Sequence, residues 1–318
     1  MTSLFSSRLA RDFEQYIVFK RALGYRYESG IRSLVRFDRY IAKHGRPRRP
    51  LQLDQLLRGW LARKGQRMAV TVALELGIVR QFLRFRRRSD PGGFVPGSEW
   101  RPGPAISHFV PHIFTLAEVR AMLAATRGLR GPRIRARTFR TLILLLYCTG
   151  LRPGEAGRLR DDDVDLKQRV LVIRQSKGKT RLVPFRADLA RDLERYRHAR
   201  RAAEPSAETF FVRSDGHPLD ERAMRRGLRD LFARTGLGRS QTGALPRPFD
   251  FRHSFAVQRL TLWYRAGADL HSKLPWLSAY LGHVDLFSTE TYLTSTPELL
   301  AAASQRFSAR VHRRVEGS

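Results

Sequence analysis

Cysteine is almost missing from this chain of 318 residues. Its single cysteine, Cys148, excludes an intrachain disulfide and a zinc site built from cysteines. Because Cys148 closes the apolar run at residues 142–148, we expect it to be a small buried side chain rather than a nucleophile.

Long hydrophobic segments are also missing. No run approaches the roughly 20 apolar residues that cross a membrane. The first residues, Met1 to Phe5, lack the basic stretch and apolar core of a secretory signal. We therefore expect a soluble protein of the cytoplasm with no membrane partner.

Acidic residues are scarce, with 29 Asp and Glu against 60 Lys and Arg, which leaves a net charge of +31. The excess is not a tail, since residues 1–112 carry +14 and the other 206 residues carry +17. Such a charge predicts a polyanionic partner, with nucleic acid as the first candidate and an anionic membrane surface as the second. The alternative is a general bias towards arginine in the proteome of the source organism, which would raise the net charge although the protein has no binding site for a polyanion.

β-Type segments are few, and most of the chain has helical periodicity. Residues 1–90 predict a bundle of four or five helices, 91–111 a linker rich in Pro and Gly, and 112–318 a second domain. The bundle has basic residues on its expected exposed faces, which favours a DNA-facing surface over a merely solvated one. They are Arg32, Arg36, Arg39, Lys43, Arg80, Arg84, Arg86, Arg87 and Arg88.

The second domain combines helices with one small β-sheet. Thr115 and Glu118 form a capping box that opens a helix over 116–125, and the apolar run 139–147 predicts a buried helix. Two β-type runs flank a turn at Ser176-Lys177-Gly178-Lys179. Further helices are expected at 188–203, 220–235, 252–264, 274–281 and 297–311. The fold class is thus mainly α with a small β-sheet.

Five residues of this domain together suit attack on a phosphodiester. Arginine binds phosphate oxygens in bidentate fashion, so Arg152 and Arg252 are candidate phosphate ligands. Lys177 on a turn can protonate a leaving oxygen, His283 can hydrogen-bond phosphate, and Tyr292 can act as a nucleophile. Taken singly, each is more often an ordinary surface or core residue.

The order and local sequence of these residues resemble the tyrosine recombinase (phage integrase, Xer-like) family over about residues 112–307. Five segments are similar to its motifs: Phe114 to Val119, Thr149 to Glu155, Ile173 to Pro184, Asp250 to Ala256, and Tyr280 to His283 with Tyr292 nine residues later. The N-terminal bundle is similar to the family's core-binding, SAM-like domain only in size, helicity and charge.

The resemblance implies a metal-free and cofactor-free DNA strand transferase. It implies that Tyr292 attacks DNA to leave a 3′-phosphotyrosine and that Lys177 is the general acid. Arg152, Arg252 and His283 would stabilise the phosphate, and Glu155 would orient Arg152. The family exchanges strands in tetramers whose C-terminal helices dock onto neighbours, and residues 297–311 are the candidate helix here.

One position departs from the family pattern. Phe249 stands three residues before Arg252, where the family usually has a histidine that acts in proton transfer. Phenylalanine cannot exchange a proton, so three interpretations stay open. The enzyme is active but slower, His253 beside Arg252 compensates, or the protein is a weakly active accessory member that works beside other recombinases.

The function expected from the sequence is site-specific recombination or transposition of a mobile element, by a transposon- or plasmid-borne member of the family. A silent DNA-binding clamp and a type IB-like topoisomerase are the rivals. The sequence does not give the DNA target, the direction of the reaction or the need for partner recombinases.

Overall fold

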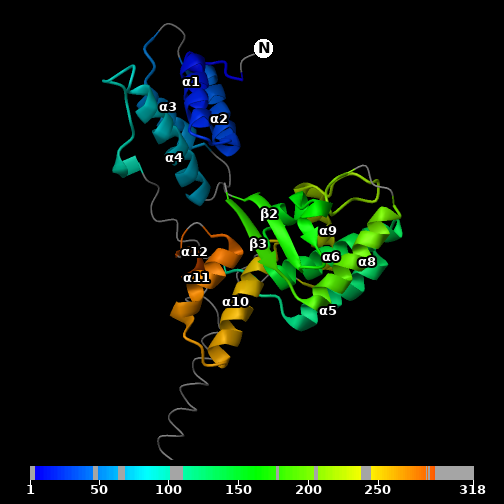
Figure 1. The fold of residues 1–318 in the computed structure, drawn as a ribbon. Helices are drawn as coiled ribbons and strands as arrows, with labels where there is room; N and C mark the ends of the chain where they lie inside the picture. The colour runs from blue at the N-terminus through cyan, green and yellow to red at the C-terminus, as the bar shows by residue number, and fades with distance from the viewer. Residues whose placement is uncertain are drawn as a thin grey trace, which may run out of the picture. The chain divides into compact units, whose positions relative to one another are not determined.

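The structure is a computed structural model, and it divides the chain into two compact units, residues 1–108 and 109–318 (Figure 1). It describes residues 4–45, 49–63, 69–100, 110–176, 179–203, 207–237, 245–283, 285 and 287–290. The division after residue 108 falls inside the predicted linker, 91–111. Among the helices in the described ranges, none is long and apolar enough to cross a membrane.

The N-terminal unit contains four helices in its described part: α1 (Ala10–Ala22), α2 (Glu28–His44), α3 (Leu53–Leu61) and α4 (Ala69–Arg86). Aromatic rings fill its centre. Phe13 stacks on Phe82 with ring centroids 4.2 Å apart, and Phe37 lies 5.0 Å from Trp60. A buried carboxylate, Asp38, accepts backbone N–H groups of residues 6 and 7 at 2.7 and 3.0 Å and fixes the start of the chain on the bundle.

Residues 91–100, the first part of the predicted linker, belong to this bundle. Phe94, Val95 and Trp100 pack against its core, and Arg58 lies over the Trp100 ring at 4.2 Å. Arg80 donates to the carbonyl of residue 96 at 2.9 Å. The segment thus extends the bundle, because the apolar side chains between its Pro and Gly residues pack on the bundle core.

The second unit is built around one central helix, α6 (Arg133–Thr149), which packs against helices on several sides. The other helices are α5 (Leu116–Ala125), α7 (Pro153–Arg158), α8 (Ala187–Arg201), α9 (Glu221–Arg234), α10 (Asp250–Arg265), α11 (Leu270–Leu281) and α12 (Phe287–Glu290). Figure 1 shows α10 and α11 together on one side of the unit and α5, α6, α8 and α9 on the other.

The sheet has three antiparallel strands in the order β1 (Val164–Asp165), β2 (Val170–Ser176) and β3 (Lys179–Pro184). Leu171 pairs with Val183, and both side chains are fully buried. The mainly helical fold with one small sheet is as predicted. Helix α5 has the predicted bounds because both halves of the Thr115 and Glu118 capping box form.

Two local predictions were wrong. Helix α11 begins at Leu270 rather than 274, because Asp269 caps it by accepting the N–H groups of His271 and Ser272, and Pro275 lies inside the helix. Cys148 is exposed, not buried. Although α6 is apolar nearly all round near its end, the stripe at 137, 140, 144 and 148 is only half-buried or exposed, and Cys148 lies at its exposed end.

Candidate active site

The predicted phosphate-binding residues meet at the C-terminal end of α11. Gly282 ends the helix in the left-handed conformation, with φ of 68°, which glycine adopts without strain. His283 follows and donates its backbone N–H to Ser278 O at 3.0 Å. The last carbonyls of a helix have no partner within it and carry its partial negative charge, so this end attracts cations.

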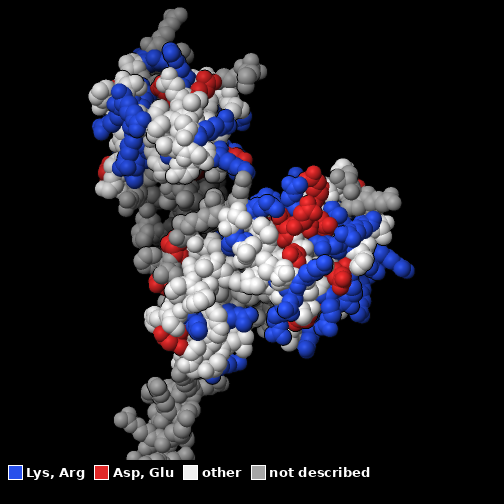
Figure 2. All heavy atoms as spheres, viewed as in Figure 1, with Lys and Arg blue, Asp and Glu red and all other residues white. Residues whose placement is uncertain are grey.

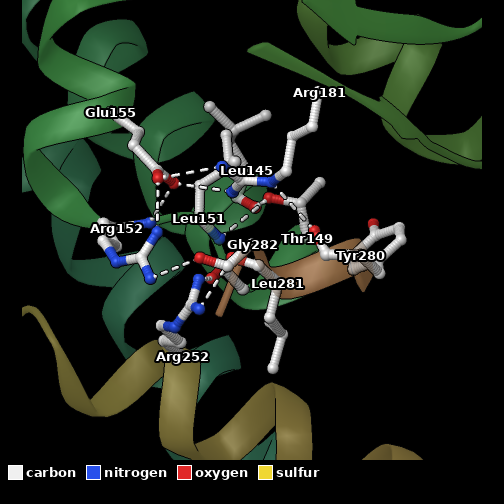
Figure 3. Close-up of polar contacts among 11 residues, drawn as sticks. Leu145, Thr149, Leu151, Arg152, Glu155, Arg181, Arg252, Tyr280, Leu281 and Gly282 are labelled. Atoms are coloured by element: carbon white, nitrogen blue, oxygen red, sulfur yellow. Dashed lines mark hydrogen bonds and ion pairs between the residues drawn. The ribbon is translucent and has the colours of Figure 1, made fainter. Parts of the chain in front are cut away.

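Arginines from three different elements donate to three successive carbonyls of this helix end (Figure 3). The donor–acceptor distances are 3.0 Å for Arg181 Nε to Tyr280 O, 2.7 Å for Arg252 Nη2 to Leu281 O and 2.9 Å for Arg152 Nη2 to Gly282 O. The structure therefore brings Arg152 and Arg252 together, although 100 residues separate them in the sequence.

Arg152 lies where the sequence predicted, at the junction of two helices. Gly150 ends α6 with φ of 62°, and a Cβ there would lie 2.7 Å from the Phe255 ring. Arg152 then caps α7 and is bound twice by one carboxylate. Its N–H donates to Glu155 Oε2 at 2.9 Å and its Nη1 to Glu155 Oε1 at 2.7 Å. Glu155 therefore fixes both the backbone and the guanidinium of Arg152.

Arg252 is completely buried on α10. Its Nη1 donates to Gly150 O at 3.0 Å, so one guanidinium joins the end of α6 to the end of α11. The neighbouring Phe251 stacks on Phe114 at 4.3 Å, which anchors this part of α10 in the core. A buried guanidinium keeps its charge, because arginine stays protonated at every relevant pH.

Arg181 is a site residue that we did not single out from the sequence. It binds Glu155 with both terminal nitrogens, Nη1 to Oε1 at 3.0 Å and Nη2 to Oε2 at 2.9 Å. A signal for it existed. Val183, two residues along β3, is fully buried while Leu182 is 63% exposed. Strand alternation thus points Arg181 inward, where an arginine needs a partner.

His283 lies beside this cluster. Its Nδ1 is 2.7 Å from the Thr289 hydroxyl, and Thr289, on α12, is fully buried. This contact ties the imidazole to the short helix that precedes Tyr292 in the sequence. Tyr292, Lys177 and the predicted helix 297–311 lie outside the described residues.

Phe249 forms part of the wall of an open cleft of about 640 Å³ that also contains Arg152. Its ring is 37% exposed and meets His253 edge-on at 5.2 Å. Helices α7 and α9 contribute further arginines to the walls: Arg158, Arg225 and Arg229. The cleft lining combines apolar residues and arginines with two carboxylates, Glu155 and Glu221. Phe249, at the position of the expected histidine, contributes an aromatic ring to it.

Burial lowers the pKa of His253 from 6.5 to about 4. The folded protein therefore keeps this imidazole neutral, while the unfolded chain takes up a proton below pH 6.5. The associated stability is complete above pH 6.5 and is lost as the pH falls towards 4. We expect His253 alone to remove about 2 kcal/mol of unfolding free energy between pH 7 and pH 5.

Denaturant unfolding of the wild type and of His253→Asn at several pH values measures this contribution. The variant is expected to show the shallower pH dependence over this range. Parallel curves would mean that His253 is not buried as a neutral ring.

Chemically, the cluster gathers three guanidinium groups at one helix end. Arg152 and Arg181 share a single carboxylate, that of Glu155, and Arg252 donates to the Leu281 carbonyl, so positive charge remains in excess at the end of α11. Preorganised arginines stabilise charge that develops on phosphate oxygens during transfer. The fold and the site thus define a protein suited to phosphoryl transfer.

The comparisons agree with this assignment. The model of the phage integrase family matches residues 113–298. The chain therefore belongs to the phage integrase family. Among its relatives, the putative integrase/recombinase y4rB of Sinorhizobium fredii (strain NBRC 101917 / NGR234) is 34% identical over 315 residues, which are 96% of this chain and 98% of that protein. The tyrosine recombinase XerC of Staphylococcus saprophyticus is 30% identical over 72% of each chain.

Solved structures share the fold at lower identity. The Tn1549 transposon integrase in complex with transposon right end DNA is 18% identical, with a TM-score of 0.65 over 97% of this chain and 100% of that chain. The XerH site-specific recombinase bound to palindromic difH substrate is 20% identical, with a TM-score of 0.65 over 86% of this chain and 79% of that chain.

Proposed function

We propose that this protein is a site-specific DNA recombinase that cuts and rejoins duplex DNA through a covalent tyrosine intermediate. The observation that carries the proposal is the convergence of Arg152 and Arg252 on successive carbonyls at the end of α11, immediately before His283. These three side chains would bind the non-bridging oxygens of the scissile phosphate.

In the proposed reaction the Tyr292 oxygen attacks phosphorus and the bond from phosphorus to the 5′ oxygen breaks. Tyr292 gives its proton to water, since Phe249 cannot accept it, and the leaving 5′ oxygen takes one from Lys177. The phosphodiester is replaced by a phosphotyrosine ester, so the later rejoining needs no external energy source. Glu155 keeps Arg152 in place through both of its oxygens.

Charged surfaces of both units support DNA as the partner. On α2, basic side chains recur at the helical spacing of one exposed stripe: Arg32, Arg36, Arg39 and Lys43. In the second unit, Figure 2 shows basic and acidic side chains side by side on the face in view, so the support there comes from the exposed cleft arginines Arg158 and Arg229. We further propose that the protein acts as a tetramer on paired DNA sites, either of identical subunits or together with partner recombinases. We propose a mobile element as its substrate and the cytoplasm as its location.

The proposal is tested by capturing a covalent protein–DNA adduct. Wild-type protein is incubated with a library of nicked duplexes made from the DNA on both sides of its gene, and adducts are isolated under denaturing conditions and sequenced. A nick lets the cut strand diffuse away, so the intermediate accumulates. The expected result is an adduct at one defined sequence. If no duplex gives an adduct, the proposed enzymatic activity is wrong and the protein is a DNA-binding clamp without catalysis. If monomers relax supercoiled DNA, the protein is instead a topoisomerase.

Two arginines of the cleft are expected to contact the DNA backbone. Arg158 and Arg229 are exposed, and within the described part of the chain neither forms an ion pair. We expect the double change to Gln to weaken binding of a random-sequence duplex about tenfold. The slope of log affinity against log salt should fall by about one per arginine. Changing Arg191 and Arg201 of α8 to Gln removes the same charge outside the cleft, and an equal loss there would show that only net charge matters.

A further prediction concerns Phe249 and the rate of proton transfer at the site. Its neighbour His253 has a pKa of about 4, which makes it a weak base at neutral pH. We therefore favour an active enzyme with slow proton transfer over compensation by His253. Phe249→His should raise the rate of adduct formation by about tenfold or more, measured on the duplex recovered above. An unchanged or lower rate would mean that the cleft is adapted to the phenyl ring.

A further inference from the structure

One side chain, that of Arg181, joins the described part of the Lys177 hairpin to the cluster that contains Arg152. This arginine lies on β3, the edge strand of the sheet, opposite Ile173 of β2. It follows Lys177 by four positions. Its guanidinium reaches away from the hairpin to Glu155 of α7 and to the Tyr280 carbonyl of α11.

The geometry of this attachment is restrictive. Arg181 uses Nη1 and Nη2 on the two oxygens of one carboxylate, and Nε on a backbone carbonyl. A bidentate pair fixes orientation as well as distance. The side chain of Arg181 is 12% exposed and that of Glu155 1%, so water competes little for either.

Gly282 leaves room for the guanidinium. A Cβ on Gly282 would lie 2.8 Å from Nη1 of Arg181 and 2.9 Å from its central carbon. The glycine before His283 is therefore needed twice, once for its left-handed backbone and once for the close approach of Arg181. A second tie supports the same strand, since the Tyr280 hydroxyl donates to Pro184 O at 3.1 Å.

We propose that Arg181 is a positioning residue that holds the Lys177 hairpin in register with Arg152 and the end of α11. Glu155 is the shared element, because its two oxygens bind Arg181 and Arg152 together. The described part of the hairpin and the phosphate ligands are thereby coupled through one buried carboxylate. The inference rests on the proposed function, in which Lys177 protonates the leaving oxygen.

A substrate that needs no proton donor tests this coupling. The probe is the duplex recovered in the adduct experiment, made with oxygen or with sulfur as the bridging 5′ atom at the cut. A thiolate leaves without protonation because thiols ionise near pH 8.5. We expect Arg181→Gln to slow cleavage of the oxygen substrate roughly 10–100-fold, and to slow the sulfur substrate about threefold or less, as Lys177→Ala should.

Arg197→Gln is the matched control. The Arg197 side chain is 16% exposed, pairs with Asp161 at 3.0 Å and donates to the carbonyls of Asp161 and Val164. It has the same kind of bonds and burial as Arg181, away from Glu155. Its loss should destabilise the second unit without changing the ratio of sulfur to oxygen rates. Arg181→Lys, which keeps the charge but not the bidentate geometry, is expected to recover only part of the oxygen rate.

The outcomes are separable. If the wild type forms no adduct, the proposed function fails. If the wild type cuts both substrates but Arg181→Gln loses both rates equally, Arg181 does not act through the proton donor and the inference is wrong. If Arg181→Gln folds poorly, amide hydrogen exchange of the full chain without DNA gives a second test, on the milder Arg181→Lys variant. Arg181→Lys should speed exchange in residues 170–184 and at the end of α11, while Arg197→Gln should not. Unchanged exchange there would also overturn the inference.

Discussion

A Tyr292→Phe variant is expected to form no covalent adduct with DNA while binding it as tightly as the wild type. The phenyl ring keeps the size and apolar character of tyrosine but lacks the oxygen that attacks phosphorus. Loss of a sole nucleophile removes the covalent step altogether, and we expect a fall of at least about 10⁴-fold. Denaturing gels measure the adduct, and gel shifts on the same duplex measure binding.

Tyr280→Phe is the control for this prediction. Tyr280 also belongs to the cluster, but its hydroxyl donates to Pro184 O and burial raises its pKa to about 12. A hydroxyl that is bound and hard to ionise is a poor nucleophile, so this variant should keep its adduct. If Tyr292→Phe still forms the adduct, or if Tyr280→Phe no longer forms it, Tyr292 is not the nucleophile. Mass spectrometry of the peptide linked to DNA would then identify the residue that is.

The sequence predicted this fold well where local signals coincide with burial. The Thr115 and Glu118 capping box placed α5 to the residue, since both bonds of the box depend only on neighbours in the chain. Hydrophobic content failed at Cys148, because an apolar run does not say which face of a helix the core leaves uncovered. Helix α11 was predicted to begin at 274, whereas Asp269 caps it four residues earlier and Pro275 lies inside the helix.

Three of the predicted site residues come together in the structure, but their connections were not predicted, and the roles of the site residues stay predictions. Arg152, Arg252 and His283 were identified by motif, and the structure brings them to one helix end. Arg181 was overlooked because its partners, Glu155 and Tyr280 O, lie 26 and 99 residues away. Such a contact depends on which faces of α7, β3 and α11 meet, and no local pattern encodes that meeting.

Glu155→Gln is expected to give the largest loss of stability among single changes at the site. The change keeps the shape of the side chain and removes its charge, which leaves Arg152 and Arg181 around a neutral amide. Removing one partner of a buried ion pair costs about 3–5 kcal/mol, because the remaining charge stays out of water. Calorimetry should show the second unit melting roughly 10 °C lower, and adduct formation should slow about 100-fold as Arg152 loses its orientation.

Asp163→Asn separates this effect from the general cost of losing a buried carboxylate. The Asp163 side chain is 3% exposed and accepts from Arg174 Nε at 2.5 Å, but the Arg174 side chain is 59% exposed. The freed arginine stays in water there, so the loss should be only about 1–2 kcal/mol with an unchanged rate of adduct formation. Equal losses in the two variants would show that Glu155 acts as any buried carboxylate does.

Inorganic phosphate sharpens the comparison. In Glu155→Gln the two arginines carry uncompensated charge, so a bound anion gains more there than in the wild type. Because a ligand that binds only the folded state raises its stability, added phosphate should restore part of the lost melting temperature in Glu155→Gln and little in Asp163→Asn. Recovery confined to Glu155→Gln would locate the anion site at these arginines, and equal recovery in both variants would contradict it.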